Sequence, residues 1–160
     1  TDCGGQIRLF LDRSLAPARR MKFDKLEFDK LGGICIMRCK IEKLIAGKEE
    51  ALIIKIPLKA VTDFIVLFAA LHLEKIQSIH LGDKASDCFV NIQRDIAKKV
   101  PEYVIRINDE TFPIPRTSLE AIASLMTDVA INGWSDVAHI DIELNEYISV
   151  CFYVEPPSQT

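Results

Sequence analysis

Three side chains that could do chemistry occupy alternate positions near the end of the chain: His139, Asp141 and Glu143. Apolar and polar residues alternate over 137–144, which predicts a strand with these three on its outward face. Imidazole and carboxylate groups can bind metals or move protons. Alternate side chains of one strand, however, stand about 7 Å apart, whereas ligands lie about 2 Å from a metal. A metal-dependent enzyme built on these residues is therefore our second alternative, and we expect neither catalysis nor a cofactor.

The following segment places tyrosines beside these residues. Residues 148–154 also alternate, and a hairpin around Asn145 would bring the two polar faces to the same side of a sheet. Tyrosine supplies contact area at a low cost in conformational entropy. We therefore predict a partner-binding surface, with a solvated sheet face as the competing interpretation. The predicted surface consists of Asp136, His139, Asp141, Glu143, Tyr147 and Tyr153.

Charge is distributed unevenly along the chain. The net charge is −3, but all 20 Lys and Arg residues lie at or before Arg116. The last 44 residues contain seven Asp or Glu and no base. A lobe of one sign would steer association with a basic partner. The competing interpretation is a face that only promotes solubility.

A basic cluster lies near the start, where Arg13, Arg19, Arg20, Lys22 and Lys25 surround Phe23. Basic residues beside aromatic ones are typical of single-strand nucleic-acid binders. The chain as a whole is acidic, with a pI of about 5.6, which argues against nucleic acid as the partner. Such a cluster is more often solvated, or meets the acidic half of a second copy in a homo-oligomer.

Composition fits one globular domain over residues 1–160, of which 49% are hydrophobic and 27% charged. The longest apolar run, 64–71, is far shorter than the roughly 20 residues of a membrane span, and the start lacks the pattern of a signal peptide. The chain has five cysteines, Cys3, Cys35, Cys39, Cys88 and Cys151, and three of them lie in apolar, strand-like runs. We interpret the cysteines as reduced thiols and expect a cytoplasmic protein.

The sequence contains a weak internal repeat, with segments 34–93 and 102–155 as its two copies. Seven positions of similar character recur at an offset of 58 residues. The pairs are Ile56/Ile114, Pro57/Pro115, Val61/Leu119, Phe64/Ile122, Leu67/Leu125, Phe68/Met126 and Leu71/Val129. Their spacing predicts two amphipathic helices, over 58–73 and 118–132. Thr117 and Glu120 predict a capping box for the second, and Gly133 a left-handed C-cap.

Strands are expected on both sides of each helix. We predict them over 6–11, 34–45, 49–56, 76–81, 88–92, 103–107, 111–114, 137–144 and 148–154. The fold class is therefore α+β, with two hairpin–helix–hairpin repeats and two main helices packed on mostly antiparallel sheet. Duplicated βα units also occur in sliding clamps and in the Whirly and PUR nucleic-acid-binding domains, a similarity of architecture alone.

Motifs of the common enzyme classes are missing from the sequence: it has no P-loop, no dinucleotide fingerprint and no nucleophile elbow. We therefore expect a small protein that binds another protein. An antitoxin or immunity-type inhibitor that masks a basic partner with its acidic C-terminal half combines these features. The first alternative is an oligomeric nucleic-acid-binding module of the duplicated-βα type.

Overall fold

The computed structural model describes residues 27–28, 33–82, 88–95, 97, 99 and 102–158. Three features predicted from sequence lie outside these residues: the strand over 6–11, the basic cluster over 13–25, and Cys3.

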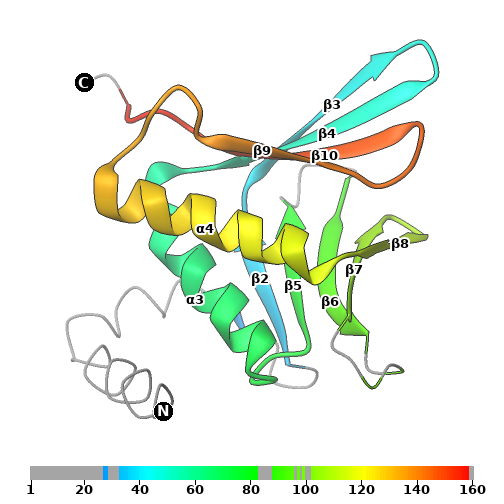
Figure 1. The fold of residues 1–160 in the computed structure, drawn as a ribbon, viewed down its shortest axis with the longest axis horizontal. Helices are drawn as coiled ribbons and strands as arrows, with labels where there is room; N and C mark the ends of the chain where they lie inside the picture. Colours follow the sequence, from blue (N-terminus) through cyan, green and yellow to red (C-terminus); the bar gives the residue numbers. More distant parts are fainter. Residues whose placement is uncertain are drawn as a thin grey trace.

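A six-stranded sheet, called sheet A here, forms one layer of the molecule (Figure 1). Its order is β1-β2-β5-β6-β7-β8, and its neighbours are antiparallel except for β2 and β5. The strands are β1 (Glu27–Phe28), β2 (Ile34–Arg38), β5 (Ser78–Gly82), β6 (Val90–Asp95), β7 (Glu102–Ile107) and β8 (Glu110–Ile114).

A four-stranded sheet, sheet B, crosses above it in Figure 1. Its order is β3-β4-β10-β9, in which β4 and β10 are parallel and the outer pairs antiparallel. The strands are β3 (Lys40–Ala46), β4 (Glu49–Ile56), β9 (His139–Glu143) and β10 (Ile148–Val154). Sheet B is thus built from two distant parts of the sequence.

Two helices, α3 (Val61–His72) and α4 (Arg116–Asn132), pack against each other. A 3-10 turn, Leu58–Ala60, leads into α3. The first helix contacts β5 and β6, and the second contacts β7 of sheet A and β9 of sheet B. The helices therefore share a single core with the inner faces of both sheets.

Apolar spacing explains how each helix is buried. Residues three or four positions apart lie on one helix face, and the repeated positions of both segments supply that face. On α3, Phe64 and Phe68 are buried with ring centroids 5.5 Å apart. On α4, Ile122 and Met126 are buried, whereas Leu125 is only half-buried.

The predicted strand over 34–45 is wrong as a single element. The chain leaves sheet A after Arg38 and enters sheet B at Lys40, with buried Cys39 between them. The alternating pattern continues through the crossing, so the sequence does not mark it. The division into two strands follows from their pairing partners, because β2 pairs with β5 in sheet A while β3 pairs with β4 in sheet B.

The predicted capping box is also wrong. Helix α4 begins at Arg116, with Pro115 at the N-cap and no side-chain capping hydrogen bond. Arg116 Nε lies 2.9 Å from Glu120 Oε1, so this ion pair engages the carboxylate that the box would require. At the other end, α4 stops before Gly133 as predicted, and the Gly133 N–H donates to Val129 O. The predicted left-handed cap is wrong, because Gly133 combines a φ of 89° with a ψ of 174°, which is extended rather than helical.

The structure confirms the α+β class with two main helices. Each half has the order hairpin, helix, hairpin, but the halves join differently in the two sheets: β6 pairs antiparallel with β7, whereas β4 pairs parallel with β10. Superposition of the two segments therefore stays a prediction. Among the described residues, neither helix combines the length and apolarity needed to cross a membrane.

Core truncation tests this arrangement. Phe64 is fully buried, so Phe64→Ala should lower the free energy of unfolding by about 3–5 kcal/mol through the cavity it leaves. Ile131 on α4 is 75% exposed, so Ile131→Ala should change that free energy by less than about 0.5 kcal/mol. Urea unfolding measures both, and equal effects would show that the core is misplaced.

Candidate functional site

The first candidate surface is the outer face of sheet B, which points away from the helices. Its four strands align three side chains each in register. In the order β3, β4, β10, β9, the three rows are Leu44–Ala51–Ser149–Glu143, Glu42–Ile53–Cys151–Asp141 and Lys40–Lys55–Tyr153–His139.

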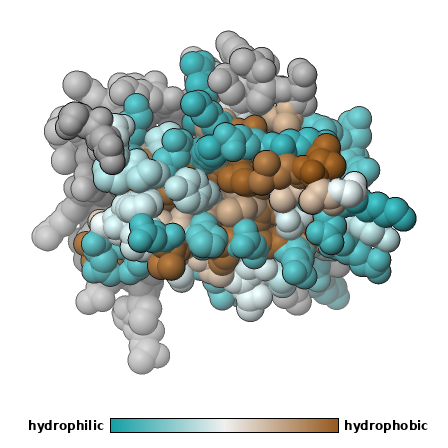
Figure 2. Space-filling view, turned by 90° about the horizontal axis from the view of Figure 1, so that it is seen from above, coloured by the Kyte–Doolittle hydropathy of each residue, from teal (hydrophilic) through white to brown (hydrophobic). Residues whose placement is uncertain are grey.

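The solvent exposure of the side chains on this face increases from the central strands to the edge strands. Side chains of the central strands, such as Ile53 and Cys151, are half-buried, whereas those of the edge strands are exposed. Viewed from above sheet B, an apolar band extends from the centre to the right of the view, between hydrophilic borders (Figure 2). Leu44 extends the apolar surface onto β3, where it is 55% exposed. An apolar centre with a polar border is the usual anatomy of a protein interface.

Four of the six predicted partner-binding residues meet on this face. His139, Asp141 and Glu143 stand side by side on β9, and Tyr153 lies opposite His139 on β10. The other two lie at the ends. Asp136 is exposed in the turn before β9, and Tyr147 is 50% exposed in the turn between β9 and β10.

The turn between β9 and β10 is held in its conformation by specific hydrogen bonds. Asn145 Oδ1 accepts hydrogen bonds from the backbone N–H groups of Tyr147 and Ile148, each at 2.8 Å. The carbonyl of Tyr147 accepts from the N–H of Glu50 at 2.7 Å. The position of Tyr147 at this corner of sheet B is therefore fixed by its own backbone.

Cys151 and Asp141 form the polar link between centre and border. Burial raises the pKa of the Cys151 thiol to about 12, with a further contribution from its hydrogen bond to Asp141. The thiol is therefore protonated at neutral pH and donates to the Asp141 carboxylate. A protonated thiol is a poor nucleophile and metal ligand, so Cys151 serves here as a half-buried hydrogen-bond donor to Asp141.

The expected acidic lobe without bases requires correction. Sheet B pairs the acidic strand β9 and its partner β10 with β3 and β4, which carry Lys40 and Lys55 on the same outer face. Lys55 Nζ lies 2.6 Å from Glu42 Oε1, and this hydrogen bond raises the lysine pKa. The β9 side of the face stays acidic, while the β3 side is mixed in sign.

The side chains of His139, Asp141 and Glu143 do not gather around a point where a metal ion could sit. Among the described residues, no three His, Cys, Asp or Glu side chains come together in a group that could hold a metal ion. The neighbouring strand β10 places Tyr153 opposite His139 and Cys151 opposite Asp141. Neither a phenol nor a protonated thiol is a usual metal ligand, so β10 does not complete a ligand set.

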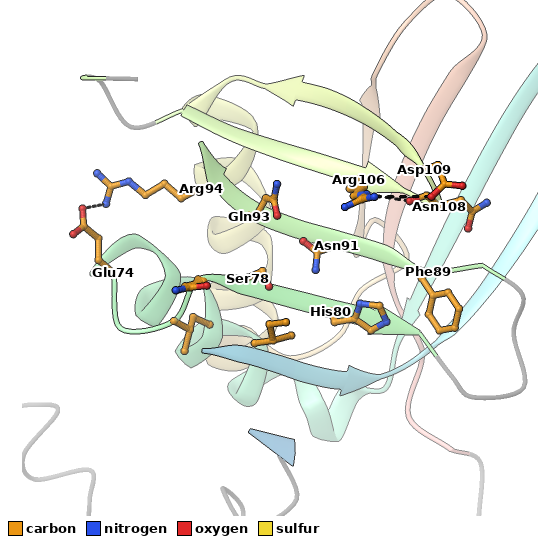
Figure 3. Close-up of a pocket in the computed structure, with 13 residues that line it drawn as sticks. Glu74, Ser78, His80, Phe89, Asn91, Gln93, Arg94, Arg106, Asn108 and Asp109 are labelled. Atoms are coloured by element: carbon orange, nitrogen blue, oxygen red, sulfur yellow. Dashed lines mark hydrogen bonds and ion pairs between the residues drawn. The ribbon is translucent and has the colours of Figure 1, made fainter. Parts of the chain in front are cut away.

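The second candidate surface is a cleft of about 970 Å³ on the outer face of sheet A (Figure 3). Register aligns Ser78 of β5 with Gln93 of β6, and His80 of β5 with Asn91 of β6. Arg106 of β7 lies opposite Asn91. Figure 3 shows these side chains projecting into the same space.

Sequence analysis missed this cleft. Polar residues alternate with buried ones in β5 and β6, and that signal was present for His80 and Asn91. Strand order, however, decides which polar faces become neighbours. The hairpin of β5 and β6 was expected, but no local pattern shows that β6 also pairs with β7 of the second half.

Comparisons with protein-family models, with curated proteins and with solved structures found no match to this chain. The geometry of the two surfaces therefore carries the functional argument.

His80 gives a testable pH dependence. Desolvation lowers the pKa of its imidazole from the ordinary 6.5. Below pH 6.5 the unfolded chain therefore binds more protons at this position, and stability should fall as the pH falls. Urea unfolding between about pH 5 and pH 8 should show a weaker loss in His80→Gln than in the wild type. Asn132 is exposed and does not titrate, so Asn132→Ala should keep the wild-type dependence. An unchanged profile in His80→Gln would contradict the burial of this imidazole.

Proposed function

We propose that this protein binds another protein through the outer face of sheet B. The observation that carries the proposal is the apolar band between hydrophilic borders (Figure 2), on the face of sheet B that points away from α3 and α4 (Figure 1). Exposed apolar patches with polar rims mark interaction sites on monomeric proteins. The apolar centre of the face would bury surface against the partner, and the polar border would fix the orientation of the partner on the face.

The centre offers anchors of the kind that hold partners for long times. Tyr153 and Ile53 are half-buried, so their remaining surface is held in place before a partner arrives. Buried aromatic anchors dominate binding energy, because little conformational entropy is left to lose. Leu44 and Tyr147, at one end of the face, add exposed apolar surface.

The border selects the sign of the partner's charge. Asp141 and Glu143 line the β9 side, with Glu42 across the sheet beside Lys55. The partner that fits has an apolar patch flanked by basic residues facing β9. A basic nucleic-acid-binding cleft of a nuclease has this charge, so an antitoxin or immunity-type inhibitor is the specific role we propose. Acidic rims of this kind raise association rates with basic partners.

Affinity capture with matched baits tests the proposal. The wild type, the face variant Asp141→Lys/Glu143→Lys and a control Glu110→Lys/Asp128→Lys would each be exposed to a lysate of the source organism. Glu110 on β8 and Asp128 on α4 are exposed outside this face, so the control matches the change in net charge. A basic protein held by the wild type and the control, but lost from the face variant, supports the proposal. Equal retention by the face variant, or capture of only nucleic acid or only further copies of the chain, contradicts it.

Binding kinetics with that protein separate the two parts of the face. The face variant should associate about tenfold more slowly, because steering is lost, and its association should depend less on salt. Tyr153→Ala should instead dissociate about fivefold faster, because an anchor is removed. Surface plasmon resonance at two ionic strengths measures both rates. Unchanged rates in both variants would mean that the face only promotes solubility.

A further inference from the structure

We propose that the cleft on the outer face of sheet A binds an uncharged planar heterocycle, namely a nucleobase or nucleoside. This site is separate from the outer face of sheet B, and the proposal does not depend on the protein-binding role. Five properties of the cleft support it: size, rigidity, charge balance, an unpaired buried acceptor and an aromatic wall.

The cleft is large enough and firmly held. Its volume of about 970 Å³ is at the upper end of the range for small-molecule sites, about 300–1,000 Å³. Its floor consists of side chains from three hydrogen-bonded strands, β5, β6 and β7. Sites on strands keep their polar groups better positioned than sites on loops. A nucleoside therefore fits with room to spare.

Charges that line the cleft are already compensated. Arg94 is ion-paired with Glu74 at one end (Figure 3). Arg106 lies 3.9 Å from Asp109 at the other end, and its Nε donates to Asn108 O at 3.2 Å. Burial lowers the pKa of His80, so its ring is neutral at pH 7. A phosphate or carboxylate would find no surplus positive charge here, and the cleft therefore favours an uncharged ligand.

One buried acceptor in the cleft lacks a partner. Among the described residues, Asn91 Oδ1 is the buried side-chain oxygen without a hydrogen bond. Leaving such a group unpaired is destabilising, and unpaired buried groups in native proteins call for an explanation. The atom is closed to solvent in this structure, so a ligand N–H would satisfy it once the Asn91 side-chain amide turns toward the cleft. Asn91 and Gln93 point to the same face two residues apart, so the floor presents amide donors and acceptors side by side.

An aromatic pair closes one end of the cleft. The rings of His80 and Phe89 lie with centroids 5.1 Å apart and a tilt of 34°, and Phe89 keeps 41% of its surface exposed. Gly82, at a φ of +152°, permits this position, because an added Cβ would lie 3.3 Å from Phe89 Cδ1 and from Cys88 O. Amide groups that read a polar edge, next to an aromatic surface for stacking, are the elements of nucleobase recognition.

Titration of the ¹⁵N-labelled full chain with adenosine, guanosine, cytidine and uridine, and separately with ribose, tests the site. At least one nucleoside should give saturable shifts confined to β5, β6, β7 and the Asn91 side-chain amide, and ribose should give none. Asn91→Ala should weaken binding about tenfold, because an amide contact to a base edge is removed. Asn132 on α4 is exposed and distant from the cleft lining, so Asn132→Ala should bind as the wild type does.

Phe89→Ala provides an independent variant if Asn91→Ala does not fold. It should weaken the same nucleoside at least fivefold through the loss of stacking, which is worth about 1–3 kcal/mol per base. Absence of saturable shifts with all four nucleosides would overturn the proposal. So would binding of ribose as tight as that of the nucleosides, or wild-type affinity in both cleft variants.

Discussion

The parallel pairing of β4 with β10 holds the two halves of this protein in one molecule. Seven residue pairs run in register from Ile148 opposite Glu50 to Val154 opposite Ile56. Parallel strands cannot be joined by a tight turn, and here the chain between them contains both helices and the strands β5 to β9. The helices and strands between β4 and β10 therefore belong to a segment whose two ends are held side by side by this pairing. The pairing continues past β10, where Glu155 N–H donates to Ile56 O.

This constraint creates two outer faces of different character. Because β4 and β10 occupy the middle of sheet B, Ile53 and Cys151 become half-buried neighbours, and the charged side chains of this face, apart from Lys55, lie on the edge strands. Sheet A instead places β6 in the middle, and its outward side chains, such as Asn91, are polar. The inner faces and both helices supply the common core. One face consequently suits a macromolecular partner, and the other suits a small polar ligand.

Local structure and the four hairpins could be predicted from the sequence, but the pairing between hairpins could not. The alternation over 148–154 and the apolar spacing around Phe64 gave elements close to those observed. The break at Cys39 lacked any local signal, because alternation continues while the pairing partner changes. The acidic strand β9 was predicted with its correct outward face, but the lysine in the same sheet, Lys55, comes from a strand about 85 residues earlier. The cleft around Asn91 also requires the pairing of β6 with β7, which joins the two halves and has no local signal.

Register between β4 and β10 is therefore the most direct test of this account, since a shift of one residue would exchange the inner and outer side chains. Cross-strand nuclear Overhauser effects between backbone protons of 50–56 and 148–154 measure it. The account predicts a parallel pattern with Ile53 opposite Cys151. Effects that place Cys151 opposite Leu52 or Ile54, or that pair 148–154 with a strand of sheet A, would contradict it.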